Sequence, residues 1–326
     1  MALMTSDKIR WGLIGCGDIA RKRVAPAIRD LEQCDFLAVN RSRSERAKSF
    51  AEEFGARKWY DTWRELIADD EIDAIYIATP VDLHSKITIA AAEAGKHVLC
   101  EKPMALTVEE CDDMIGAAAK HSVALGIAYY RHFYPMIARI KEIISTGEIG
   151  QAVMAQINTF EWFDSEQGEP RPWRLDRNQS GGGPMADFGC HRIEVLINIF
   201  GSIQTARGLM GQAIFKRDVE DSAVSTFKHK KGMYSVLSVT HGALEPQDTL
   251  SIFGSEGSLH VPVLNDGTLI VKTRASKRNE EHPNHPNIHQ PLLEDFTNAI
   301  LEKREPLITG EIGREVNRIL DQLYAP

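Results

Sequence analysis

The stretch Gly12-Leu13-Ile14-Gly15-Cys16-Gly17-Asp18-Ile19-Ala20 decides the fold of this chain. It begins inside an apolar run, residues 9–14, that is typical of a strand, and it leads into a helical pattern at residues 19–31. A G-x-G-x-x-A fingerprint in this position allows a tight turn at Gly15, a close approach of the backbone to a pyrophosphate at Gly17, and close packing of helix and strand at Ala20. We therefore expect a dinucleotide at the start of this helix, bound by Gly15, Gly17, Asp18 and Ile19. A plain tight turn is the alternative.

The first 130 residues alternate short apolar runs with helical patterns, which predicts βαβ units and a doubly wound parallel (Rossmann) sheet. The expected strands are residues 9–14, 36–39, 58–60, 72–78, 97–100 and 123–128. The expected helices are residues 19–31, 44–54, 62–68, 85–94 and 108–120.

Beyond Pro135 longer alternating patterns predict an α+β domain with a mostly antiparallel open sheet. The expected strands are residues 153–163, 206–215, 222–229, 233–240, 249–253, 258–261 and 268–271. The expected helices are residues 136–145, 185–200, 291–303 and 311–323. We place a dinucleotide-binding domain at residues 1–130 and a substrate-binding and oligomerisation domain at residues 131–326.

Composition narrows the class of protein. The chain has 326 residues, 43% apolar and 26% charged, which excludes disordered and fibrous classes. A net charge of -8 with interspersed signs gives no support for binding nucleic acid or an anionic membrane, so the expected partner is a small molecule. The apolar runs are too short for a membrane span, and the first ten residues lack the apolar stretch of a secretory signal. Five widely spaced cysteines without a C-x-x-C pair favour reduced thiols, so we expect a cytoplasmic location.

The end of the second strand predicts the type of dinucleotide. An NAD site usually carries an acid there for the ribose 2′-hydroxyl, whereas this chain carries Asn40-Arg41-Ser42-Arg43. A neutral Asn40 does not repel a 2′-phosphate, Arg41 can pair with one, and Ser42 can donate a hydrogen bond to it. NADP is therefore the preferred cofactor. In the alternative, the arginines are solvated and Asn40 binds NAD.

Two further strand ends face the expected ligand crevice. Thr79-Pro80 follows the fourth strand, and Glu101-Lys102-Pro103 follows the fifth, so Lys102 is expected to point to the nicotinamide. A plain surface charge is the alternative for this lysine.

Together these motifs resemble the Gfo/Idh/MocA family, named after glucose-fructose oxidoreductase, inositol dehydrogenase and MocA. The resemblance extends over nearly the whole chain, through His84, residues 92–103 and 129–135, Gly181-Gly182-Gly183, the run Asp187-Phe188-Gly189-Cys190-His191 and the two closing helices. It implies that Lys102, Asp187 and His191 form the catalytic group. It also implies a dimer or tetramer formed through the C-terminal sheet. The further residues expected to bind the cofactor are Thr79, Pro80, His84, Glu101, Lys102 and Arg174.

The spacing of the acid and the histidine makes chemical sense without the resemblance. Asp187 and His191 are four residues apart, so on a helix opened by Pro184 they share one face. A histidine with a pKa near 6.5 exchanges protons at neutral pH, and a neighbouring carboxylate orients it. Lys102 would stabilise negative charge on the same substrate oxygen. The alternatives are an acid that complements the helix dipole and a buried, satisfied histidine.

Other residues are candidates for the substrate. Trp162 and Trp173 could form an apolar wall for a sugar ring, although aromatic residues are more often core. Tyr130 and Arg131 lie in a segment that lines the cleft in relatives, which often have Asn at the position of Tyr130. No metal is expected, because prolines interrupt the tract that contains His282, His285 and His289.

These observations predict an NAD(P)-dependent oxidoreductase acting on a secondary alcohol or ketone of a sugar, inositol or related polyol. Two alternatives remain: a reductase of a dihydrodiol, imine or tetrapyrrole, and a nucleotide-binding regulator without catalysis.

Overall fold

A computed structural model describes residues 8–42, 44–164 and 172–325. The chain divides into two compact units. One contains the residues up to Tyr130 together with His285–Arg314, and the other contains Arg131–Asn284 together with the residues from Glu315 onward.

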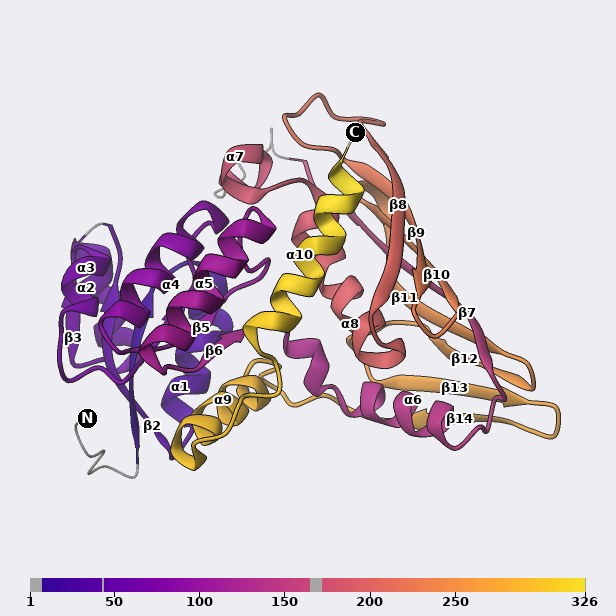
Figure 1. The fold of residues 1–326 in the computed structure, drawn as a ribbon, viewed down its shortest axis with the longest axis horizontal. Coiled ribbons are helices and arrows are strands. Elements are labelled where there is room, and N and C mark those ends of the chain that lie inside the picture. The colour runs from indigo at the N-terminus through magenta and orange to yellow at the C-terminus, as the bar shows by residue number, and fades with distance from the viewer. Residues whose placement is uncertain (1–7, 43, 165–171, 326) are drawn as a thin grey trace. The chain divides into compact units, whose positions relative to one another are not determined.

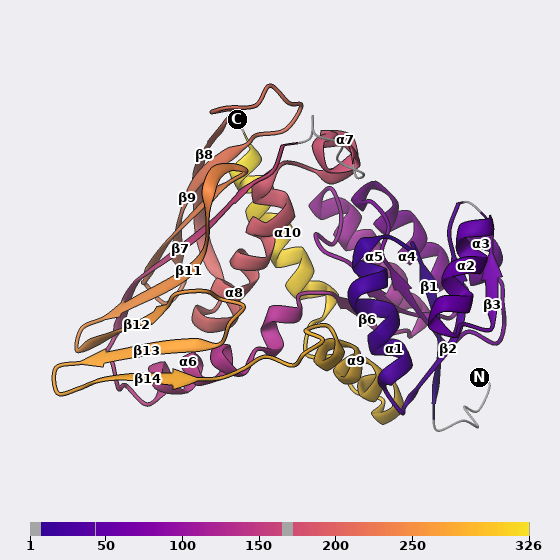
Figure 2. The same ribbon diagram turned by 180° about the vertical axis from the view of Figure 1, so that it is seen from behind.

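The first unit is built on a six-stranded parallel sheet, as predicted, in the order β3-β2-β1-β4-β5-β6. Helices cover both faces: α4 and α5 lie in front of the strands in Figure 1, and α1 lies in front of them in Figure 2. The largest fully buried side chains of this unit include Trp11 and Tyr76. The strands are β1 (Ile9–Ile14), β2 (Cys34–Asn40), β3 (Lys58–Tyr60), β4 (Ala74–Ile77), β5 (His97–Cys100) and β6 (Leu125–Ile127). The helices are η1 (Ala20–Val24), α1 (Ala25–Asp30), α2 (Ser44–Phe54), α3 (Trp63–Ile67), η2 (Val81–Leu83), α4 (His84–Glu93), α5 (Val108–His121) and α9 (Gln290–Glu302).

The segment His285–Arg314 packs within this first unit, although the sequence-based division put it in the second domain. Its contacts explain this: the Phe296 ring of α9 packs with its centroid 5.8 Å from that of Trp11, and Thr297 Oγ1 hydrogen-bonds with the Cys34 thiol at 3.4 Å. The functional division at residue 130 stays a prediction.

The second unit is built on an eight-stranded sheet in the order β14-β13-β12-β11-β7-β10-β9-β8. β7 and β10 pair in parallel, and all other neighbours pair antiparallel, which confirms the mostly antiparallel prediction. The strands are β7 (Ala152–Trp162), β8 (Ile203–Gly211), β9 (Ser222–His229), β10 (Tyr234–Thr240), β11 (Gly242–Gly254), β12 (Gly257–Val261), β13 (Thr268–Thr273) and β14 (Lys277–Glu281). The helices are η3 (Tyr130–Phe133), α6 (Pro135–Ser145), η5 (Pro172–Leu175), α7 (Arg177–Ser180), η6 (Met185–Gly189), α8 (Cys190–Phe200) and α10 (Gly310–Tyr324); η3 and α10 each run from one unit into the other.

In the part of the chain that the structure describes, α6 and α8 lie on one side of this sheet in both views (Figures 1 and 2). The alternate strand residues Ile157, Leu237 and Leu250 are fully buried. The opposite face, which we call the open face, presents Val224 and Tyr234, both about half exposed.

Three strand predictions need correction. The strand expected at residues 249–253 begins earlier, at Gly242, as part of β11, whose pairing with β7 shifts register between Gly242 and Gln247. The strand expected at residues 206–215 ends at Gly211, because the Asp221 carboxylate accepts hydrogen bonds from the backbone amides of Ala213, Ile214 and Phe215, which a strand would need for its ladder. β14 was missed because its sequence, Lys-Arg-Asn-Glu-Glu, has no apolar alternation; its charged side chains form ion pairs instead, among them Glu280 with Arg139 at 2.8 Å.

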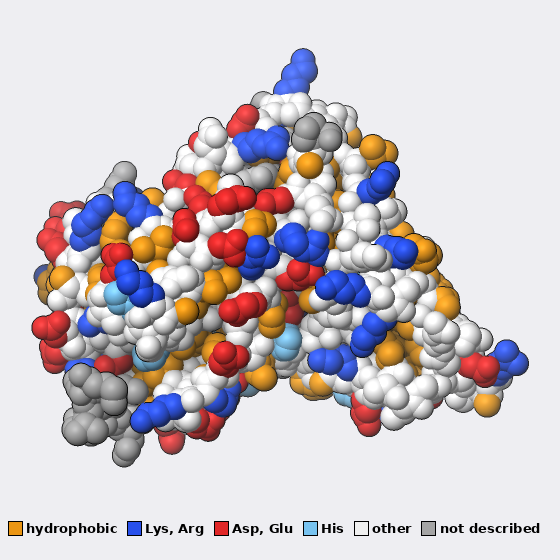
Figure 3. All heavy atoms as spheres, viewed as in Figure 1, with side chains coloured by type: hydrophobic (Ala, Val, Ile, Leu, Met, Phe, Trp, Pro, Cys, Tyr) orange, Lys and Arg blue, Asp and Glu red, His pale blue; other side chains and the backbone are white. Residues whose placement is uncertain are grey.

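Charged side chains are interspersed on the surface. On the face drawn in Figure 3, the blue and red side chains lie among one another. No helix in the described part of the chain is long and apolar enough to cross a membrane.

Candidate active site

The glycine turn after β1 has the geometry that a dinucleotide needs. Gly15 has φ +96°, and a Cβ there would stand 2.4 Å from the Ala78 carbonyl oxygen, so only glycine fits. A Cβ at Gly17 would meet no atom within 4 Å, so the backbone borders open space at this point. Ala20 is fully buried at the helix–strand contact. These residues therefore fit the pyrophosphate of a dinucleotide. Of the neighbouring candidates, Asp18 is exposed and lies 3.0 Å from Lys22, and the Ile19 side chain is also exposed.

The end of β2 lies beside this turn. Arg41 Nη1 donates to the Cys16 carbonyl at 3.2 Å, so its guanidinium is held next to the glycines. Asn40 is buried, and its amide nitrogen donates to the Tyr60 carbonyl at 2.9 Å. Ser42 is exposed, and Arg43 lies outside the described residues. Burial raises the pKa of the Cys16 thiol to about 12, so this cysteine is protonated at neutral pH.

The ends of β4 and β5 are tied together by His84. Its ring is buried, with Nδ1 3.0 Å from the Pro103 carbonyl and Nε2 3.1 Å from the Thr79 carbonyl. Burial lowers the pKa of His84, so the ring is neutral at pH 7. A neutral imidazole can donate to only one of these two carbonyl oxygens at a time. The His84 ring therefore lies between the backbone that follows β4, at Thr79, and the backbone that follows Lys102, at Pro103.

Glu101 supports Lys102 from inside the first unit. Its buried carboxylate accepts hydrogen bonds from the Tyr76 hydroxyl at 2.7 Å and from the Lys102 backbone amide at 3.2 Å. His289 Nε2 lies 3.6 Å from Glu101 Oε1. Burial alone would raise the pKa of Glu101, but His289, Lys102 and Tyr76 together bring it below its ordinary value. Tyr130, a predicted substrate residue, stacks on His289 with ring centroids 4.5 Å apart.

In the second unit, one continuous helical stretch contains Asp187 and His191. The sequence predicts a helix opened by Pro184, and in the structure Pro184 is the N-cap; the next five residues form a π turn (η6) before α8 begins at Cys190. Such turns occur often at functional sites. Asp187 N donates to the Gly183 carbonyl at 2.9 Å, and His191 is buried.

Glu220 fixes the start of this stretch, and sequence reasoning missed it. Its buried carboxylate accepts hydrogen bonds from Gly183 N at 2.9 Å, Met185 N at 3.1 Å and the Tyr324 hydroxyl at 2.8 Å. A Cβ at Gly183 would stand 2.0 Å from the Glu220 carbonyl oxygen, which explains the glycine there. The only signal in the sequence is an acid just before a strand, which is common on protein surfaces.

Arg174 is brought to Asp187. Its Nη1 lies 3.1 Å from Asp187 Oδ2, and both side chains are mostly buried. Trp173 lies beside this pair, since the Arg174 guanidinium is 5.8 Å from its ring. Trp162, in contrast, is about half exposed and packs edge-on against Phe215 at 5.3 Å.

His241 and Arg217 also belong to the surroundings of Asp187, and neither was predicted. Burial lowers the pKa of His241 to about 4, and the charge of Asp187 is the strongest influence in the opposite direction. Arg217 Nη1 lies 3.4 Å from His241 Nδ1.

Arg131, a predicted substrate residue, is buried near a second acid of α8. Glu194 Oε1 lies 2.7 Å from His132 Nδ1. Burial raises the pKa of Glu194, and the charges of His132 and Arg131 partly offset this increase.

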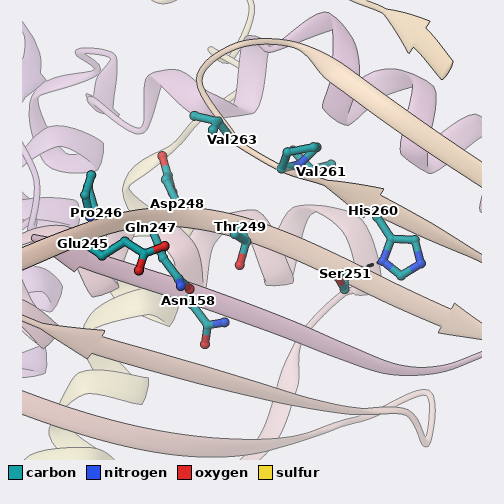
Figure 4. Close-up of a pocket in the computed structure, with 11 residues that line it drawn as sticks. Asn158, Glu245, Pro246, Gln247, Asp248, Thr249, Ser251, His260, Val261 and Val263 are labelled. Carbon is teal, nitrogen blue, oxygen red and sulfur yellow. Dashed lines mark hydrogen bonds between the residues drawn. The ribbon is translucent and has the colours of Figure 1, made fainter. Parts of the chain in front are cut away.

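A cavity of about 420 Å³ is lined by residues of β7, β11 and β12 and of the loop after β12 (Figure 4). In it, Ser251 Oγ lies 3.0 Å from His260 Nδ1. Its lining consists of Asn158, Glu245, Pro246, Gln247, Asp248, Thr249, Ser251, His260, Val261, Pro262 and Val263. The histidine tract lies elsewhere: His282 contacts Glu280 at 2.9 Å, His285 contacts Asn287 at 2.9 Å, and His289 is buried as described. In the described ranges no three His, Cys, Asp or Glu side chains gather as a metal site would need.

The first unit is a parallel α/β unit with an open glycine turn, and the second has a mostly antiparallel sheet and a helical stretch with a half-buried acid and a buried histidine. Together these features define a dinucleotide-dependent oxidoreductase. Comparison with known proteins agrees. Residues 9–129 match the family model described as "Oxidoreductase family, NAD-binding Rossmann fold", and residues 137–260 match the GFO/IDH/MocA C-terminal domain.

Individual relatives match almost end to end. The 1,5-anhydro-D-fructose reductase of Ensifer adhaerens is 30% identical over 93% of this chain and 92% of its own length. The myo-inositol 2-dehydrogenase of Thermotoga maritima is 26% identical over 94% of this chain and 92% of its own length. A levoglucosan dehydrogenase, solved in complex with NADH and levoglucosan, has a TM-score of 0.89 and 25% identity, with 97% of this chain and 96% of that chain covered. The chain therefore belongs to the Gfo/Idh/MocA family of oxidoreductases, and its first unit is an NAD(P)-binding Rossmann domain.

Proposed function

We propose that this chain interconverts a secondary alcohol and a ketone on a sugar, inositol or related polyol, with NADP as its preferred cofactor. The observation that carries the proposal is the helical stretch on which Asp187 and His191 lie one turn apart, with Arg174 paired to the acid at 3.1 Å. The names of the relatives, which refer to anhydrofructose, myo-inositol and levoglucosan, support a substrate of this class.

Each residue of the catalytic group has a role that its chemistry allows. When bound, the nicotinamide supplies or accepts the hydride at the reacting carbon. His191 takes the proton from the substrate hydroxyl in oxidation and returns it in reduction. Asp187 orients His191 and stabilises its charged form, while Arg174 pairs with the Asp187 carboxylate. Lys102, supported by Glu101, stabilises negative charge that develops on the same oxygen.

Substitution of His191 and Lys102 tests these roles. With D-xylose, D-glucose, myo-inositol, levoglucosan and a trans-dihydrodiol as probes, H191A and K102A should each lower kcat about 100-fold or more and leave the affinity for NADPH within about threefold. Matched controls are H285A and K120A, which remove exposed side chains of the same types. Normal turnover in H191A and K102A would refute the roles. Turnover of the dihydrodiol alone would refute the sugar class, and no wild-type turnover with tight NADPH binding would indicate a non-catalytic regulator.

The preference for NADP rests on the end of β2. The Arg41 guanidinium is held beside the glycine turn, where a 2′-phosphate would gain a charge-assisted contact, and the Asn40 amide nitrogen is already used by Tyr60. R41A should lower the affinity for NADPH about tenfold or more and leave that for NADH within about twofold. A wild-type preference for NADH would contradict this assignment.

We also propose that the open face of the second unit's sheet forms the contact between subunits of a dimer or tetramer. Leu209 and Val224 pair across β8 and β9 there and are 84% and 52% exposed, which is costly for apolar side chains unless a partner covers them. Light scattering should give an oligomer at micromolar concentration, and V224K should weaken it. A monomeric wild-type mass would contradict the proposal. A cytoplasmic location remains a proposal as well, supported by the five buried, free cysteines.

A further inference from the structure

His241 is a rigidly held side chain of the second unit to which nothing above assigns a role. It lies between β10 and β11, where its backbone N–H donates to the Asp221 carbonyl at 2.8 Å and its carbonyl accepts from Phe163 N at 2.9 Å. The residue is 2% exposed. Its ring is held by Phe163 and Phe188, with centroids 4.9 Å and 5.1 Å away.

The surroundings of the ring decide which nitrogen carries the proton. Arg217 Nη1 lies 3.4 Å from His241 Nδ1, and a guanidinium can only donate, so Nδ1 must be the acceptor. Because burial lowers the pKa of His241 to about 4, the ring is neutral at pH 7 and carries a single proton. That proton is therefore on Nε2, which makes this nitrogen a hydrogen-bond donor.

This donor has no hydrogen-bond partner among residues 8–42, 44–164 and 172–325. The carboxylate oxygen Oε1 of Glu161 lies 3.6 Å away, beyond hydrogen-bond distance. Buried donors in proteins are satisfied in the great majority of cases, so a deeply buried and rigid N–H without a hydrogen-bond partner in the described ranges points to a ligand. The ring lies against Phe188, the neighbour of Asp187 in η6, which puts the donor at the proposed substrate end of this unit.

We propose that His241 binds the substrate through Nε2–H, as a donor to one hydroxyl oxygen of the sugar or polyol, and thereby determines which substrates are accepted. This inference rests on the proposed function. A neutral N–H donor suits an uncharged hydroxyl oxygen, and a site built around such a bond discriminates against analogues that lack the hydroxyl. His241 acts in binding, so its effect should fall on KM rather than on kcat.

Two substitutions separate the donor from the shape of the ring. H241F keeps a flat ring and removes the donor, whereas H241Q can place an amide N–H near the position of Nε2. The probes are D-xylose, D-glucose, myo-inositol and levoglucosan, followed by the deoxy analogues of the probe that the wild type turns over best. H241F should raise the KM for that probe about tenfold and change kcat less than about threefold. H241Q should have a KM close to that of the wild type.

For the wild type, one deoxy analogue should have a KM about tenfold higher than the parent probe. For H241F, the KM of that analogue should equal the KM of the parent probe, because the substitution and the missing hydroxyl remove the same hydrogen bond. Nitrogen-15 NMR of the wild type should report a neutral imidazole with the proton on Nε2. An unchanged KM in H241F, equal losses in H241F and H241Q, or a proton on Nδ1 would each overturn the inference while the proposed function stands. A wild type that turns over none of the probes would overturn both.

Discussion

Removal of the negative charge of Glu220 should loosen the helical stretch that contains Asp187 and His191. In the E220Q variant the side chain keeps its shape, but one carboxylate oxygen becomes an NH₂ group. The two oxygens together accept three hydrogen bonds, from Gly183 N, Met185 N and the Tyr324 hydroxyl. In either orientation of the amide, one backbone N–H therefore faces a donor.

The size of the effect follows from these contacts. A hydrogen bond to a charged group contributes about 1.5–3 kcal/mol, and a buried donor left without a partner costs about 1–3 kcal/mol. We expect E220Q to lower the free energy of unfolding by about 2–4 kcal/mol. Y324F removes one of the three bonds and leaves both backbone donors satisfied, so it should cost about 1.5 kcal/mol. Since Gly183 also accepts from Asp187 N, a shift of this loop should lower kcat about tenfold.

Urea unfolding, followed by circular dichroism and tryptophan fluorescence, measures the free energies, and a turnover assay measures kcat. The expected order of stability is wild type, then Y324F, then E220Q. A loss in E220Q of less than about 0.5 kcal/mol, or no greater than that in Y324F, would refute the role given to Glu220.

Two further predictions concern the cofactor turn and His241. G17A should fold normally, since its Cβ enters open space, and should bind NADPH at least about tenfold more weakly than the wild type. G15A should instead lose stability, because its Cβ meets the backbone of Ala78. Equal NADPH affinities of G17A and the wild type, measured by fluorescence titration, would contradict the first expectation. Burial lowers the pKa of folded His241 to about 4, below its ordinary value near 6.5, so in this range the unfolded chain binds a proton that the folded chain does not. The contribution of His241 to the free energy of unfolding should therefore fall as the pH drops from about 6.5 to about 4. In H241F, the free energy of unfolding should depend less on pH in this range. The same pH dependence in H241F and the wild type would show that the pKa of the folded ring is not lowered.

Most of the fold could be predicted because local pattern and tertiary environment agree there. Most of the parallel strands are rich in buried apolar residues, and β1, β3 and β5 have the predicted bounds. Prediction failed where a side chain distant in the sequence overrides the local pattern. The apolar residues after Gly211 would extend β8, but Asp221 takes up their backbone amides.

The candidate site could be predicted in part, for a related reason. Sequence motifs with a known spacing contain Gly15, Lys102 and Asp187, so these residues could be predicted. Glu220 and His241 make contacts that only the folded chain brings together, with Gly183 in one case and Phe188 in the other. No spacing in the sequence predicts such contacts, because the two partners are far apart in the sequence.

The central claim is that Lys102 and His191 act on the same oxygen of the substrate. A crystal structure of the enzyme with NADPH and the best substrate of the panel tests this most directly. We predict that one substrate oxygen lies about 3 Å from both Lys102 Nζ and a ring nitrogen of His191, with the carbon that bears it beside C4 of the nicotinamide. Two different substrate oxygens at these side chains, or a substrate that touches only one of them, would contradict the claim.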